Sequence, residues 1–161
     1  MGYAEGTTVP SENSRAEIEK IICRYAGRDA EFSSGRMAGK VAILFVACGR
    51  KVKFVVPLPT EAEAGIGARR KNAASGSVVS ESQKAAWIEL ETRRRWRCLL
   101  LAIKSKLVVV ATGIATFEEE FASNIVLPDG STVGDVIIPE IARVYSAGGG
   151  RLLLPAFHDG P

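Results

Sequence analysis

The chain has 161 residues, of which 47% are hydrophobic and 24% are charged, and its formal net charge is +3. This length and composition predict one folded domain and exclude a wholly disordered chain, a collagen and a coiled-coil rod. The net charge is too small to indicate a nucleic-acid partner by itself. The longest near-apolar run, residues 98–113, contains Lys104 and Lys106, so we expect no membrane-spanning segment.

The cysteine pattern predicts free thiols. Cys23, Cys48 and Cys98 are widely spaced in apolar surroundings, and no CxxC pair occurs. This spacing argues against a zinc site and against a disulfide framework. The chain also does not open on a signal-peptide pattern. We therefore expect three reduced thiols in or near the core of a cytoplasmic protein.

The first predicted helix follows a polar arm. Residues 1–13 are typical of a flexible arm, and a single domain is expected over 14–147. Ser14 and Glu17 have the spacing of a capping box, and the isoleucines that follow recur at helical intervals up to Tyr25. This pattern predicts a helix over about 15–26.

Residues 31–57 have the pattern of strands. The run 41–46 is apolar and rich in β-branched residues, and 51–56 begins with strict alternation. We expect a hairpin with a two-residue turn at Gly49-Arg50, in which Phe45 lies opposite Phe54 and Ala47 opposite Val52. Residues 31–37 are expected to add a third, edge strand.

The segment 60–82 lacks hydrophobic periodicity and is rich in alanine, glycine and serine. We expect a flexible loop there, of a length that in a compact domain is usually functional or disordered. Its charge cluster is Arg69-Arg70-Lys71.

A long helix is predicted over about 83–111, with Ser80 and Gln83 as its capping pair. One face is an apolar stripe at helical spacing, made of Trp96, Leu99, Leu100, Ile103, Leu107 and Val110. Arg93, Arg97 and Lys104 follow one edge of this stripe.

The C-terminal third is predicted to contain two shorter helices. Thr116 and Glu119 form a capping box for a helix to about 124, with Phe117, Phe121 and Ala122 facing inward. A turn at Asp129-Gly130 precedes a last helix over 135–146, and residues 148–161 are expected to be a tail. The predicted fold class is α+β: a small antiparallel sheet packed against one long helix, with three shorter helices.

The residue inventory argues against catalysis. The chain has a single histidine, His158, the fourth residue from the C-terminus, which argues strongly against a histidine-based triad and a histidine-rich metal site. Asp29, Glu31 and Lys40 could form a metal-dependent nuclease site, a minor alternative because nothing in their spacing selects them. We expect no cofactor, no metal and no enzyme activity.

The basic run 93–97 carries four arginines in five residues, and mutual repulsion requires a compensating partner. Ion pairs at i,i+4 with Glu89 and Glu91 are one explanation, and phosphate contact is the other. Trp96 could stack on a base, although its place in the stripe favours the core. Predicted nucleic-acid contacts are Arg93, Arg94, Arg97, Lys104, Lys51, Lys53, Arg50, Arg69, Arg70 and Lys71.

Three stretches, residues 94–107, 113–121 and 124–134, together with the hairpin 43–59 upstream, resemble a group of short uncharacterised proteins encoded by bacteriophages and prophages. The resemblance covers about residues 14–145. It implies a phage gene product acting in a bacterial cytoplasm, and it carries over no catalytic residue.

Two functions of different classes follow. One is a nucleic-acid-binding accessory of phage DNA metabolism, for single-stranded DNA or a duplex backbone; the order of helix, strands and long helix is loosely like that of small strand-annealing proteins. The other is a protein–protein interaction module, such as an inhibitor of a host defence system, with the loop 60–82 and the apolar tail as contacts. A homo-oligomer is compatible with either function.

Overall fold

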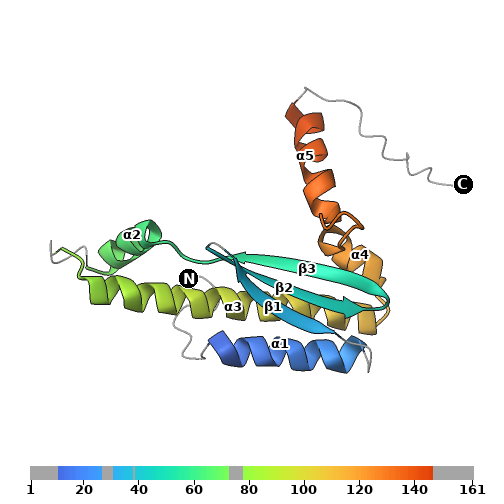
Figure 1. Ribbon diagram of the computed structural model, residues 1–161, viewed down its shortest axis with the longest axis horizontal. Coiled ribbons are helices and arrows are strands. Elements are labelled where there is room, and N and C mark those ends of the chain that lie inside the picture. The colour runs from blue at the N-terminus through green and yellow to red at the C-terminus, as the bar shows by residue number, and fades with distance from the viewer. Residues whose placement is uncertain (1–10, 27–30, 38, 73–77, 147–161) are drawn as a thin grey trace, which may run out of the picture.

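The structure is a computed structural model, and it describes residues 11–26, 31–37, 39–72 and 78–146 (Figure 1). The elements in chain order are α1 (Ser11–Ala26), β1 (Phe32–Met37), β2 (Lys40–Ala47), β3 (Arg50–Pro57), α2 (Glu61–Asn72), α3 (Glu81–Ala111), α4 (Phe117–Phe121), the 3₁₀ helix η2 (Ala122–Asn124) and α5 (Val133–Ser146). The predicted α+β class, with a small antiparallel sheet and one long helix, is confirmed. The predicted tail 148–161 and His158 lie outside the described residues.

The sheet has the order β1-β2-β3 with antiparallel neighbours, and the predicted third strand is confirmed as β1. The predicted hairpin register is wrong. Cys48 and Gly49 form the turn with φ of 51° and 71°, as a type I′ hairpin requires, so Phe45 pairs with Val52 and Ile43 with Phe54. The shift is two residues, and each side chain therefore keeps the predicted face.

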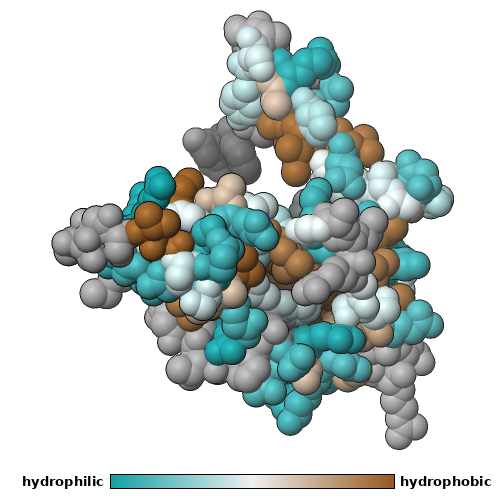
Figure 2. Space-filling model, turned by 60° about the vertical axis from the view of Figure 1, so that its left-hand side comes forward, coloured by the Kyte–Doolittle hydropathy of each residue, from teal (hydrophilic) through white to brown (hydrophobic). Residues whose placement is uncertain are grey.

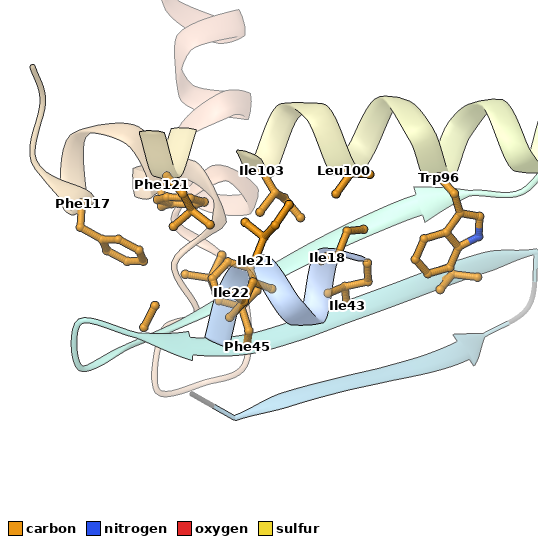
Figure 3. Close-up of a cluster of buried hydrophobic side chains, with 14 residues drawn as sticks. Ile18, Ile21, Ile22, Ile43, Phe45, Trp96, Leu100, Ile103, Phe117 and Phe121 are labelled. Carbon is orange, nitrogen blue, oxygen red and sulfur yellow. The ribbon is translucent and has the colours of Figure 1, made fainter. Parts of the chain in front are cut away.

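The core lies on one face of this sheet, here called the inner face. Trp96, Leu100, Ile103 and Leu107 of α3 are buried there with the isoleucines of α1 and with side chains of β2 and β3, in the cluster that Figure 3 shows. Burying one such side chain contributes about 1.5–3 kcal/mol. The predicted stripe of α3 is thus the centre of the fold, and its predicted capping box is present at Ser80.

Helix α1 begins earlier than predicted. Ser11 is already helical, so the predicted arm does not extend to residue 13, and residues 1–10 lie outside the described part. Ser14 does not cap the helix: it is fully buried, and its Oγ has no hydrogen-bond partner among the described residues. Glu17 contacts Arg97 at 3.1 Å instead of reaching back to a helix start.

The expected flexible loop 60–82 is wrong over α2. Thr60 and Glu63 cap this helix, with the Thr60 amide donating to Glu63 Oε2 at 2.8 Å. Its packing face consists of small residues: Ala64 and Ala68 are buried, and a Cβ on Gly67 would lie 2.1 Å from the Trp87 ring. Because alanine and glycine give little hydrophobic periodicity, the sequence pattern missed a helix that packs closely on α3. Residues 73–77 lie outside the described part.

Two smaller expectations also change. The cysteines Cys23, Cys48 and Cys98 are exposed, not in the core. Cys48 occupies the tight turn, and Cys98 lies on the side of α3 away from its stripe. Phe117 and Phe121 are buried as predicted, whereas Ala122 is exposed because η2 begins there.

Candidate functional site

The arginines of α3 are held in ion pairs. Arg93 Nε lies 2.7 Å from Glu89 Oε1, Arg94 Nη1 lies 3.2 Å from Glu91, and Arg97 Nη1 lies 3.1 Å from Glu17 of α1. The fourth, Arg95, donates to the Pro57 carbonyl at 2.6 Å and approaches Glu63 and Glu91. Each guanidinium thus has a carboxylate neighbour, which offsets the repulsion within the run and weakens its positive field.

The lysines of the hairpin lie on a different surface. Lys51 and Lys53 alternate with the core residues Val52 and Phe54, so they project from the outer face of the sheet, opposite α3. Lys53 Nζ donates to the Gly130 carbonyl at 3.0 Å. Arg50, at the start of β3, pairs with Glu118 at 3.3 Å. The sheet separates these lysines from the arginines of α3.

Arg69, Arg70 and Lys71 form the last turn of α2 and are exposed. Among the described residues, no carboxylate lies within ion-pair distance of these three side chains. Lys104 is exposed on the same edge of α3 as Arg93 and Arg97. The predicted contacts therefore lie on separate surfaces: the α3 edge carries Arg93, Arg97 and Lys104, the outer sheet face Lys51 and Lys53, and the end of α2 the remaining cluster, while Arg50 lies beside α4.

Metal-ligating side chains do not cluster in the described part of the chain. No three of its histidine, cysteine, aspartate or glutamate side chains lie close enough together to hold a metal ion, and Asp29 of the minor nuclease alternative is outside it. The pKa of Glu119 is lowered, first by the Thr116 amide and then by its hydroxyl. That carboxylate caps α4, which is a structural role.

A short hairpin, residues 125–132 and here called the anchor hairpin, attaches the last helix to the sheet. Ile125 pairs with Val52 at the edge of β3, and the Val126 amide donates to the Lys51 carbonyl at 2.8 Å. The chain turns at Gly130, whose φ is 86°, in the predicted position. The hydrogen bond from Lys53 to Gly130 adds a second attachment of the anchor hairpin to β3, on the outer face of the sheet.

Helix α5 starts at a rigid base. The Thr132 amide donates to Asp135 Oδ2 at 2.8 Å and the Asp135 amide to Thr132 Oγ1 at 3.1 Å, which is a capping box. These hydrogen bonds, the backbone one first, lower the pKa of Asp135. Gly134 packs on η2: a Cβ there would lie 2.7 Å from the Ser123 carbonyl oxygen. The direction of the first turn of α5 is therefore fixed.

Beyond this base, α5 projects from the body of the molecule (Figure 1). Large apolar side chains on it are exposed, namely Val136 (49%), Ile137 (47%), Ile138 (61%), Ile141 (49%) and Tyr145 (68%). At 100° per residue, Ile137, Ile138, Ile141, Val144 and Tyr145 share one face, here called the α5 stripe. Val136 lies outside it, about 140° around the helix from Ile141. Figure 2 shows hydrophobic side chains on the lower part of the projecting helix.

The base of the α5 stripe borders a cleft of about 330 Å³ beside β3. Val55 from the outer sheet face and Ile138 from α5 both line it, with Lys53 and Asp135 among its polar side chains. Val55 is itself 49% exposed. The α5 stripe and the outer sheet face thus meet at this cleft. Val55 and Ile138, which line it, are both exposed.

Comparisons with protein-family models, with curated proteins and with solved structures give no match. The resemblance to phage proteins therefore stays a prediction. Among the helices that the structure describes, none combines the length and apolar character that crossing a membrane requires.

Sequence reasoning placed the last helix but did not recognise its surface as a candidate site. The signal was present, because the apolar residues of 133–146 recur at helical spacing. Such spacing normally indicates the core, and only the structure shows that this stripe stands outside it.

Proposed function

We propose that the protein is a protein–protein interaction module whose docking element is α5. The observation that carries this proposal is the exposed α5 stripe on a helix whose base is fixed by the anchor hairpin. Contiguous apolar surface costs free energy in water, and on folded domains it usually marks a contact surface. A helix already formed and oriented also loses less conformational entropy on binding than a disordered segment does.

A pair of positions on α5 tests this function. Ile141 and Val136 are both 49% exposed, but Ile141 lies in the stripe and Val136 outside it. Each is replaced in turn by the photocrosslinking residue p-benzoylphenylalanine in the full chain, expressed and irradiated in bacterial cells. We expect covalent protein adducts from position 141 and few from position 136. Equal adducts from both positions, or none from either, would overturn the proposal.

Nucleic-acid binding is kept as a second candidate because the end of α2 favours it. Among the described residues, no carboxylate pairs with Arg69, Arg70 or Lys71 as carboxylates pair with the α3 arginines, so more of their charge is available to phosphate. The helix C-terminus offers a second explanation, since its dipole also favours cations there.

A comparison of two double variants tests this second candidate. Arg69→Ala with Arg70→Ala removes cations that have no carboxylate neighbour in the described part of the chain, whereas Arg93→Ala with Arg97→Ala removes ion-paired ones. Binding of a labelled single-stranded oligonucleotide is measured at several salt concentrations. The first double variant is expected to flatten the log–log salt slope more than the second. Absence of binding even at low salt would remove nucleic acid from consideration.

A further inference from the structure

The strand β2 carries apolar side chains on both of its faces. Its inner-face residues belong to the core, and on the outer face it presents Ala42, Leu44 and Val46. Antiparallel strands with one solvated face usually alternate apolar and polar residues, and continuous apolar runs are typical of strands covered on both sides. The outer side of β2 thus has the composition of a covered strand, yet its Leu44 and Val46 are only half-buried.

In the described part of the chain, two apolar surfaces therefore lack a complete cover, the outer sheet face and the α5 stripe. We propose that each α5 stripe docks on the outer sheet face of a second copy of this chain, in a reciprocal two-fold dimer. This inference rests on the proposed function, because it names the partner of the same helix.

Charge supports a second copy as the occupant. Lysines frame the outer face, with Lys40 and Lys51 exposed and Lys53 beside the cleft. Helix α5 has a small acidic excess: Glu140 is paired with Arg143 at 2.9 Å, and Asp135 lies at the helix base beside Lys53 of the same chain. Docking places this small acidic excess beside the lysines of the outer face, whereas the association of two α5 helices would bring two such helices together.

The dimensions of the two surfaces match. A helix of 14 residues is about 21 Å long, and a strand of eight residues spans about 26 Å. Ser33 and Gly35 of β1 lie on the outer face and are small, so a helix can approach it closely.

Helix α5 is prevented from covering its own sheet. The packing of Gly134 against Ser123, the Thr132 capping box and the anchor hairpin fix its first turn at the edge of β3. Its outer turns stand beyond that edge, and folding back would break these contacts. A second copy can cover both apolar surfaces while the contacts at the base of α5 stay intact. Because each chain docks its α5 on the other, the assembly closes at two chains.

Sedimentation of the full chain over a range of concentrations tests the inference. We expect a dimer at micromolar concentration, with the dissociation constant raised about a hundredfold or more by Ile141→Asp and little changed by Val136→Asp. Val55→Lys, on the outer face, is expected to weaken the dimer as well. Circular dichroism and thermal unfolding of each variant establish that it is folded.

Mixing two variants distinguishes the docking mode. A copy with Ile141→Asp keeps an intact outer face, and one with Val55→Lys keeps an intact α5 stripe. Each alone is expected to be monomeric, whereas the mixture regains one native contact and forms a heterodimer. No gain on mixing, or a Val55→Lys variant as dimeric as the parent chain, would overturn helix-on-sheet docking.

The crosslinking experiment separates failure of this inference from failure of the proposed function. An adduct at position 141 with the mass of two chains supports both. An adduct with a different protein, from a chain that sediments as a monomer, supports the interaction function and overturns the second copy as partner. No adduct, from a chain that sediments as a monomer, overturns both.

Discussion

Helices α3 and α5 both carry an apolar stripe at helical spacing, but the stripe of α3 is buried and that of α5 is exposed. In α3 the stripe is covered by the sheet and α1, and Leu100 and Ile103 are at most 1% exposed. In α5 the stripe stands free of the body, and Ile138 and Tyr145 are more than half exposed. Both helices begin at a capping box, so the difference lies in what surrounds them.

This difference teaches that helical spacing of apolar residues predicts burial without saying where the covering surface lies. For α3 the cover is contributed by the same chain. For α5 the described residues contribute only a base, at η2 and the anchor hairpin. The free energy that the α5 stripe can gain by burial is therefore still available for association.

A matched pair of isoleucine substitutions, one in α3 and one in α5, should show the largest difference in the free energy of unfolding. Ile103 is fully buried and Ile141 is 49% exposed. Ile103→Ala is expected to lower the free energy of unfolding by about 2–5 kcal/mol, because it leaves a cavity in the core. Ile141→Ala should lower it by less than about 1 kcal/mol in dilute, monomeric protein. Urea denaturation measures both, and similar losses would mean that the α5 stripe is buried within one chain.

The next largest change in stability is expected where α2 packs on α3. This contact extends the comparison to a helix that packs through alanine and glycine. Gly67→Ala places a methyl group against the Trp87 ring and should destabilise the protein by about 1–3 kcal/mol. Gly65 is its control, since nothing lies within 4 Å of a Cβ there. Gly65→Ala should stabilise the helix by about 0.5–1 kcal/mol. Thermal unfolding distinguishes the two, and a neutral Gly67→Ala would argue against close packing of α2.

Loss of the cap of α5 should destabilise this helix more than the rest of the molecule. Thr132→Ala removes the hydroxyl that accepts from the Asp135 amide and should cost about 1 kcal/mol of helix stability. Because no other described element covers the outer turns of α5, this loss should appear as faster amide hydrogen exchange in α5, with α3 unchanged. Loss of protection throughout the molecule would instead show that α5 and the core unfold together.

The sequence predicted the parts of the fold that large apolar residues define. The stripe of α3 and the buried Phe117 and Phe121 follow from spacing. It failed where small residues or backbone conformation decide. Helix α2 packs through alanine and glycine, and the hairpin turn needs Cys48 at positive φ, a conformation that sequence patterns do not predict for cysteine.

The candidate site was harder to predict than the fold. The arginine run was visible in the sequence, but Glu17, which pairs with Arg97, is 80 residues away along the chain. The two explanations of that run, ion pairing and phosphate contact, could be weighed only once such distant neighbours were known. The apolar pattern of α5 could also be recognised in the sequence. The sequence could not show that no other described element covers this pattern.

The smallest expected effect is a difference in acid sensitivity between the two helix starts. Helix α3 is capped by Ser80 and the uncharged Gln83, whereas the cap of α5 uses Asp135. The pKa of Asp135 is lowered from its ordinary value of 3.8 by the hydrogen bonds from Thr132, the backbone one first. A carboxyl with a lowered pKa in the folded state contributes stability that is complete above the unfolded value and is lost as pH falls through the folded one. Amides in the first turn of α5 should therefore lose exchange protection as pH falls below about 4, after correction for intrinsic exchange, while those of α3 keep theirs. Asp135→Asn should remove this pH dependence, and equal acid sensitivity at both helix starts would show that the Asp135 carboxylate does not hold α5 in place.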